Sequence, residues 1–186
     1  LELIWLRRKR IVKCVWCCPV SLMEETRREI LRHTSCIDTD IHMVGPRTRE
    51  ENIPQAMWYL VGLESLGRSP RVAYVLDRLI DGGTFLVVGE STYIKGHRAK
   101  RTRRLIRFGA RTSYRLILTG TPIQQGIEDL YTQMEFLSPL ILGYPSRHAF
   151  QSALAVFQDR KQAFPVEGVS LDEVCRAIAP YVYQVS

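Results

Sequence analysis

The segment from Thr84 to Lys95, TFLVVGESTYIK, constrains the fold most strongly. It starts with an uninterrupted apolar run, Phe85 to Val88, and continues with Gly89 and the carboxylate of Glu90. An apolar run of this length that ends at glycine is typical of a strand buried on both faces, as in a parallel sheet flanked by helices. Ligands of open α/β sheets bind beyond the carboxyl ends of strands, where we expect Glu90. Alternatively, this is an ordinary core strand that leaves through a polar turn.

Strand and helix patterns alternate along the rest of the chain. Further strands are predicted at 11–18, 40–44, 56–63 and 114–118, and helices at 21–33, 69–79, 97–111, 126–137, 147–157 and 170–179. Because no Asn-Gly hairpin signal separates the strands, the alternation favours a parallel sheet with right-handed crossovers. Ser21 and Ser170 are each followed three residues later by glutamate, the pattern of a helix-starting capping box.

Two segments resemble motifs of a known family. The sequence GEST at residues 89–92, followed by YIK, resembles motif II of helicase superfamily two, which reads DEAH or similar before a nearby lysine. The sequence LTGTP at residues 118–122 is followed by a helix and by FLSP at residues 136–139. This unit is similar to motif III of the Swi/Snf family of ATP-driven DNA translocases.

Fainter similarities to the same family lie elsewhere. The strand–turn–helix unit around Pro19 and Ser21 resembles motif Ia, although Thr26 stands where that motif usually has tryptophan. The pair Glu64 and Ser65 resembles motif Ib. By this resemblance, these turns would face the phosphates of DNA, and helix N-termini do bind phosphate through their free N–H groups.

The resemblance implies a three-layer α/β fold, in which a RecA-like parallel sheet is flanked by helices as in P-loop NTPase lobes. Residues 1–140 would form a partial first ATP-binding lobe, and residues 141–186 a helical segment leading towards a second lobe. Residues 180–182 resemble the family's bridge to that lobe, but Gln184 and Val185 stand where it usually has two arginines. Because no phosphate loop of the form GxxxxGK[ST] exists in the sequence, we expect a fragment without the first strand and that loop.

The resemblance also implies roles for particular residues. Glu90 would orient the attacking water, and Thr119, Gly120 and Thr121 would couple the phosphate state to lobe movement. Gly89 stands where the family has the aspartate that holds Mg²⁺, and glycine offers no side-chain oxygen to this cation. We therefore expect ATP and Mg²⁺ to act in the intact parent protein, with slow hydrolysis, and neither to bind tightly to this chain alone.

Double-stranded DNA is the partner that the resemblance implies. The 26 basic and 19 acidic residues give a net charge of +7, which favours a polyanionic partner, although many globular domains are equally basic. The basic stretch 97–111 is predicted as an amphipathic helix that either follows a phosphate backbone or simply faces solvent. The residues expected to contact DNA are Pro19, Ser21, Glu64, Ser65, Lys95, Arg98 and Arg101.

Other features of the sequence leave alternatives open. Cys14 and Cys17 have a CxxC spacing with Cys18, His33 and Cys36 nearby. This suggests zinc, but residues three apart on a strand point to opposite faces, so buried free thiols are the other interpretation. Residues 1–10 predict a helix end whose basic run either meets the helix dipole or binds nucleic acid. No long apolar run or signal peptide is visible, so we expect no membrane span and a cytoplasmic protein, associated with a nucleoid or virus if prokaryotic or viral.

Two functions therefore stand as hypotheses. The first is a fragment of a DNA-dependent ATPase, a helicase-like translocase impaired at Gly89 and lacking its phosphate loop. The second is an inactive DNA- or protein-binding module derived from such a lobe. A flavodoxin-like domain is a third interpretation, which the sequence LTGTPIQ disfavours. The helicase interpretation requires Glu90 and the Thr119 turn to lie side by side, at the ends of adjoining inner strands that run in the same direction.

Overall fold

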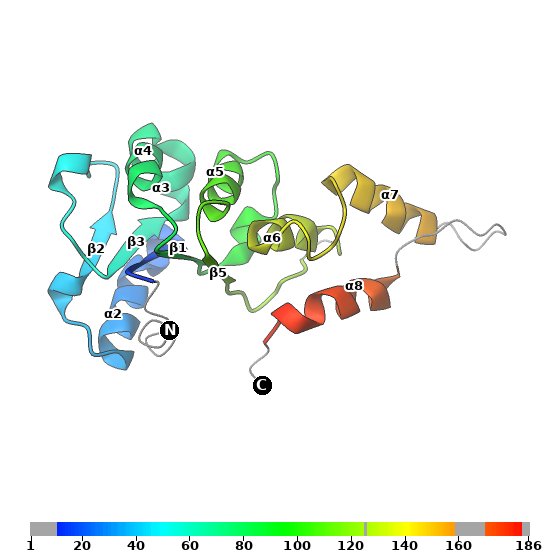
Figure 1. Cartoon of the computed structure of the whole chain (residues 1–186), viewed down its shortest axis with the longest axis horizontal. Coiled ribbons are helices and arrows are strands. Elements are labelled where there is room, and N and C mark those ends of the chain that lie inside the picture. Colours follow the sequence, from blue (N-terminus) through cyan, green and yellow to red (C-terminus); the bar gives the residue numbers. More distant parts are fainter. Residues whose placement is uncertain (1–10, 125, 159–169, 184–186) are drawn as a thin grey trace.

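The structure is a computed structural model that describes residues 11–124, 126–158 and 170–183. In the described part of the chain, five strands form one parallel sheet in the order β2-β3-β1-β4-β5. Helices lie on both faces of this sheet, which gives three layers (Figure 1). The strands are β1 (Lys13–Cys18), β2 (Ile41–Val44), β3 (Trp58–Gly62), β4 (Thr84–Val88) and β5 (Tyr114–Ile117). The predicted parallel α/β fold is confirmed.

The β4 strand is buried along its whole length, as its apolar sequence predicts. Phe85 and Val87 pack into the core on one face of the sheet, and Leu86 and Val88 into the core on the other. This alternation follows from the two-residue period of a strand, which sends successive side chains to opposite faces. A strand between two cores must be apolar at every position, which is why the run in the sequence is continuous.

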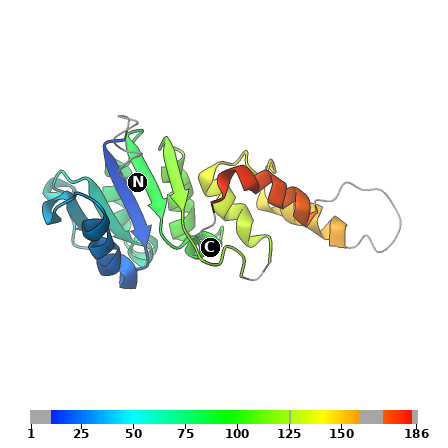
Figure 2. The same ribbon diagram turned by 90° about the horizontal axis from the view of Figure 1, so that it is seen from below.

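The helices divide between the two faces and one end of the sheet. α2 (Met23–His33) covers one face, where Ile30 packs against Trp58 and Phe85. The other face is covered by α3 (Leu63–Arg68), α4 (Pro70–Leu79) and α5 (Lys100–Gly109). Beyond β5 lie α6 (Asp129–Leu137), α7 (Arg147–Gln158) and α8 (Leu171–Ile178) (Figure 2).

The α6 helix joins the sheet to the last two helices. Phe136 packs into the large core under α3 to α5. Leu130 and Tyr131 instead belong to a small core with Phe150 of α7 and Val174 of α8. The boundary expected after residue 140 thus falls just beyond a helix that contributes to both cores, and the division of the chain there stays a prediction.

The predicted start of α2 is wrong. Ser21 does not cap a helix, because residues Val20–Leu22 form a 3-10 turn and α2 begins only at Met23, without any side-chain cap. The 3-10 turn that precedes α2 is held from another part of the chain. The backbone N–H of Val20, its first residue, donates to the Glu64 carboxylate, with 2.9 Å between the nitrogen and Oε2.

Other element boundaries were predicted with mixed success. Ser170 forms the expected capping box with Glu173, and Ser69 caps α4 ahead of its first-turn proline. The third predicted strand was too long, because β3 ends at Gly62 and α3 follows directly, a helix that the pattern did not predict. A Cβ atom at Gly62 would lie too close to Val20 Cγ2, so a larger residue at this turn would require the Val20 side chain to move.

The cysteines of β1 lie on the faces of the sheet that the two-residue period of a strand predicts. Cys14 and Cys17 are both buried but lie in cores on opposite faces of the sheet, so the CxxC pair does not converge on one site. Among the described residues, no group of three His, Cys, Asp or Glu side chains could hold a metal ion.

No helix in the described ranges combines the length and the apolar character needed to cross a bilayer. The helix end predicted at residues 1–10, and Gln184 and Val185, lie outside the described residues.

Candidate functional site

The turns after β4 and β5 meet at Glu90 and Thr119. The two strands are parallel neighbours, with Val88 opposite Ile117. Their ladder continues past both strand ends, because Ser91 N–H donates to the Leu118 carbonyl with an N–O distance of 2.9 Å. The Thr119 hydroxyl then donates to Glu90, with 2.8 Å between Oγ1 and Oε1. The predicted juxtaposition is confirmed.

One detail of that prediction is wrong, because β5 is not an inner strand of the described sheet. It stands at the edge, and all four of its residues are partly exposed. No strand among the described residues pairs with its open side. A hollow of about 300 Å³ borders this edge and is lined by Ser113–Ile117, by Leu137, Ser138 and Ile141, and by Tyr181 from the segment after α8.

The Glu90 carboxylate is held by two hydroxyl groups from two turns. Thr92 Oγ1 and Thr119 Oγ1 each donate to Oε1 over 2.8 Å. Thr119 Oγ1 in turn accepts from the Thr121 backbone N–H at 3.1 Å. Because hydroxyl donors fix the carboxylate in place, Glu90 has a defined orientation at the strand end. Gly120, the remaining residue of the predicted coupling turn, is exposed with open space around its Cα.

A buried amide in α6 connects the two turns, and sequence reasoning missed it. Gln133 is fully buried, and its Oε1 accepts a hydrogen bond from the Ser91 hydroxyl. Its Nε2 donates to the Pro122 carbonyl over 2.8 Å and to the Asp129 carbonyl over 2.9 Å. The signal was present in the sequence, since a glutamine among the apolar core positions of this helix requires polar partners when buried.

Lys95, expected to contact DNA, lies beside a buried carboxylate. Its Nζ is 3.6 Å from Asp129 Oδ2 and donates to Gln124 Oε1 over 2.9 Å. The Asp129 side chain is only 6% exposed, whereas that of Lys95 is 25% exposed. An ammonium group beside a buried carboxylate offsets the cost of burying that charge. Lys95 therefore has an internal partner, and its role towards DNA stays a prediction.

The turns that resemble motifs Ia and Ib are brought together. The Val20 N–H of the first turn binds Glu64 of the second. Pro19 is buried, Ser21 is exposed, and Glu64 and Ser65 are half-buried at the start of α3. The exposed backbone of this turn thus already has one carboxylate against it, and DNA contact by these four residues stays a prediction.

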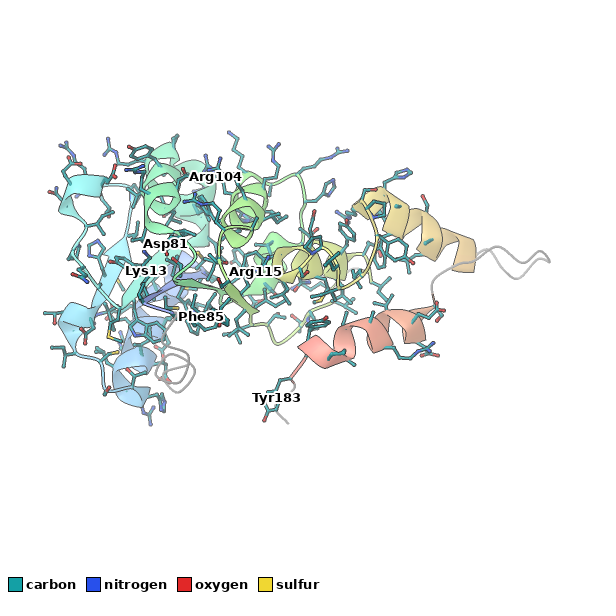
Figure 3. The ribbon with its side chains drawn as sticks, viewed as in Figure 1. Lys13, Asp81, Phe85, Arg104, Arg115 and Tyr183 are labelled. Carbon is teal, nitrogen blue, oxygen red and sulfur yellow. The ribbon has the colours of Figure 1, made fainter. Side chains whose placement is uncertain are left out.

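Several arginines of the basic stretch contact other parts of the protein, although only Arg101 and Arg104 are partly buried. Arg101 donates to the Tyr93 carbonyl over 2.7 Å and lies over the Tyr93 ring. The side chain of Arg104 extends from α5 towards α3 and donates to the carbonyls of Leu66 and Gly67 (Figure 3). Arg107 and Arg111 bind Asp77. In the described part of the chain, the exposed cations of this stretch without such a contact are Arg98, Lys100 and Arg103.

Gly89 does not fit a magnesium site. It carries no side-chain oxygen, and a Cβ atom at this position would lie 2.5 Å from Trp16 Nε1 and 3.3 Å from Cys18 Cβ. Burial raises the pKa of the Cys18 thiol, so this neighbour stays protonated at neutral pH and is not a thiolate ligand. Position 89 itself therefore offers neither a side-chain ligand nor the space for one.

Comparison with known proteins agrees with this arrangement. A solved SWI2/SNF2 ATPase core of Sulfolobus solfataricus in complex with double-stranded DNA superimposes with a TM-score of 0.70 at 21% identity, covering 97% of this chain and 35% of that one. A second structure of the Sulfolobus solfataricus SWI2/SNF2 ATPase core domain gives a TM-score of 0.68 at 21% identity, covering 96% of this chain and 34% of that one. At this identity, the similarity establishes the fold.

Curated relatives match over shorter stretches. The helicase SWR1 of Mycosarcoma maydis is 42% identical over 55 residues, which is 30% of this chain and 3% of that protein. The TATA-binding protein-associated factor MOT1 of Saccharomyces cerevisiae is 28% identical over 126 residues, which is 68% of this chain and 6% of that protein. The chain thus spans a small part of these relatives. The SNF2-related domain matches residues 7–167, most of the sequence. This chain belongs to the SNF2-related domain family.

Proposed function

We propose that this chain is part of the first ATP-binding lobe of a DNA-dependent ATPase that translocates on double-stranded DNA. The observation that carries the proposal is the hydrogen bond from Thr119 to Glu90, at the ends of adjoining parallel strands. A carboxylate held in this way can orient a water molecule towards a phosphoryl group. A structural neighbour with this fold is described in complex with double-stranded DNA, which supports the choice of partner.

In this proposal, other segments of the intact parent protein would supply the remaining nucleotide-binding groups. Its phosphate loop and second lobe would hold the nucleotide, because the sequence of this chain contains no GxxxxGK[ST] loop. The isolated chain should therefore bind Mg²⁺–ATP very weakly. A micromolar dissociation constant for Mg²⁺–ATP, measured by titration of the isolated chain, would contradict this part of the proposal.

The deciding experiment measures ATP hydrolysis by the complete two-lobed protein, with and without double-stranded DNA. We expect a rate that rises with DNA but is slow, because Gly89 supplies no side-chain oxygen for Mg²⁺. Glu90→Gln should lower the DNA-stimulated rate at least about tenfold, since it removes the group that orients water. Glu24→Gln is the matched control, because Glu24 is an exposed carboxylate on α2. An unchanged rate in Glu90→Gln would exclude the assigned role.

A binding module without turnover is the second candidate, and the packing of Trp16 against Gly89 favours it. In that case the complete protein binds duplex DNA in a salt-dependent manner but hydrolyses no ATP above background. Glu90→Gln then leaves DNA affinity unchanged, and no rate exists for it to alter. The two candidates therefore differ in one measurement, the DNA-stimulated ATPase rate of the unmodified protein.

A further inference from the structure

The space next to Gly89 is filled by the neighbouring strand. A Cβ atom at position 89 would meet Trp16 Nε1 at 2.5 Å, and both Trp16 Cε2 and Cys18 Cβ at 3.3 Å. Real Cβ atoms do not approach other heavy atoms to 2.5 Å, so any side chain at position 89 requires a movement. By contrast, a Cβ atom at Gly45 or Gly82 would have nothing within 4 Å.

The backbone of Gly89 cannot provide this movement cheaply. Its N–H donates to the Cys17 carbonyl of β1 with an N–O distance of 2.7 Å, which holds position 89 against that strand. The ladder between β1 and β4 runs directly before it, with Cys17 opposite Val88. A shift of Gly89 away from β1 would break the hydrogen bond at the end of this ladder, so the space must come from the indole ring.

The indole ring is itself held in place. Trp16 is partly buried and packs against the core that contains Cys14, Phe85 and Val87. Its ring lies tilted against that of Trp58, with 6.2 Å between the ring centroids. Turning the Trp16 ring away from Gly89 would therefore disturb an aromatic pair and part of this core.

We propose that Trp16 is the residue that excludes a metal-binding carboxylate from position 89. Its indole ring takes the space of the missing side chain, so Trp16 and Gly89 form a matched packing pair. Replacing Gly89 by aspartate alone would therefore not restore a magnesium ligand. Aspartate at position 89 fits only when position 16 carries a smaller side chain. That an aspartate at position 89 would bind magnesium rests on the proposed function, whereas the packing of Trp16 against Gly89 does not.

A thermodynamic cycle on the 186-residue chain tests the pair without nucleotide or DNA. The variants are Gly89→Ala, Trp16→Val and the two combined, with Gly45→Ala as the control for replacing a glycine in open space. Gly89→Ala should lower the Tm by about 3 to 10 °C, as overpacking of a core does in a chain of this size. Gly45→Ala should change it by less than about 2 °C.

The combined variant decides the outcome. When Trp16→Val is already present, adding Gly89→Ala should lower the Tm by less than half as much as it does in the unmodified chain, since the clashing ring is gone. An equal fall in Tm in both backgrounds would overturn the proposal. Should Trp16→Val unfold the chain, Trp16→Phe serves in its place, because phenylalanine keeps an aromatic ring in the core but lacks Nε1.

A spectroscopic measurement provides a second test on the single variant. The indole N–H resonance of Trp16, assigned by its loss in Trp16→Phe, should move in Gly89→Ala, while that of Trp58 moves less. An unmoved Trp16 resonance would show that its ring does not contact position 89. Neither measurement involves ATP hydrolysis, so a failure of the proposed function and a failure of the packing pair are separate results.

Discussion

The Thr119 hydroxyl donates a hydrogen bond to the Glu90 carboxylate, with 2.8 Å between the two oxygen atoms. This contact joins two turns 29 residues apart in the chain. It exists because β4 and β5 run in parallel as neighbours, so their carboxyl ends meet at one edge of the sheet. In the proposed ATPase, it is the physical link between the water-orienting residue and the turn expected to sense the phosphate state.

Thr119→Val should destabilise the chain by about 1 to 2 kcal/mol, because it removes a hydrogen bond to a charged acceptor and keeps the shape of the side chain. Urea unfolding measures this loss. Thr121→Val is the matched control, since Thr121 is exposed and only its backbone N–H is used in the turn. Equal stability of the two variants would mean that the Thr119 hydroxyl contributes nothing to joining the turns.

Arg104 and Arg103 are neighbours on α5 with different surroundings. Arg104 donates to the carbonyls of Leu66 and Gly67 near the end of α3, whereas Arg103 is exposed. Arg104→Ala should therefore cost about 1 to 3 kcal/mol in the free energy of unfolding, and Arg103→Ala less than about 0.5 kcal/mol. Since both variants make the same chemical change in the same helix, a difference in urea midpoint reports the interhelical contact. The absence of any difference would contradict the inward role of Arg104.

Lys95 and Arg98 separate a structural role from a DNA-binding role. Lys95→Met removes the ammonium group that lies 3.6 Å from the buried Asp129 carboxylate, so the free energy of unfolding should fall by about 1 to 3 kcal/mol. Arg98→Met should leave stability unchanged, because Arg98 is exposed. It should instead weaken binding to duplex DNA and lower the salt slope by about one, as the loss of a phosphate contact does. Unchanged DNA affinity in Arg98→Met would remove this residue from the proposed DNA surface.

Buried thiols should make the chain less stable at alkaline pH. Burial raises the pKa of Cys14 and Cys17, and the neighbouring cysteines raise both further. Below the unfolded-state value of about 8.5, both states hold these protons and stability does not change on their account. Above it, the unfolded chain releases protons that the folded chain keeps, so each thiol should lower stability by about 1.4 kcal/mol per pH unit.

Urea unfolding between pH 7 and pH 10, under reducing conditions, measures this slope. Cys17→Ala should make the slope shallower, because one of the buried thiols is gone. Cys175→Ser should leave it unchanged, since Cys175 is exposed on α8. A slope that is the same in all three chains would show that the alkaline loss of stability comes from other groups.

The parallel sheet could be predicted from the pattern of the sequence alone. The continuous apolar run of β4 indicated a strand with a core on each face, and the alternation of strands and helices favoured a parallel sheet. The resemblance to helicase motifs II and III implied that the two strands are neighbours, and parallel neighbours bring Glu90 and Thr119 together at one edge. The strands themselves follow from local composition and from the period of a strand, whereas the order of the strands does not.

Which polar groups bind one another could be read only from the folded chain. Glu64 binds the Val20 N–H at the start of the motif Ia turn, and Ser21 caps no helix. Most arginines of the basic stretch bind carbonyls or Asp77, and Gln133 connects the two turns from a distant helix. The contact of Trp16 with Gly89 depends on how one ring leans across two strands. Such contacts join residues far apart in the chain, and the periodicity of a sequence carries information only about neighbours along it.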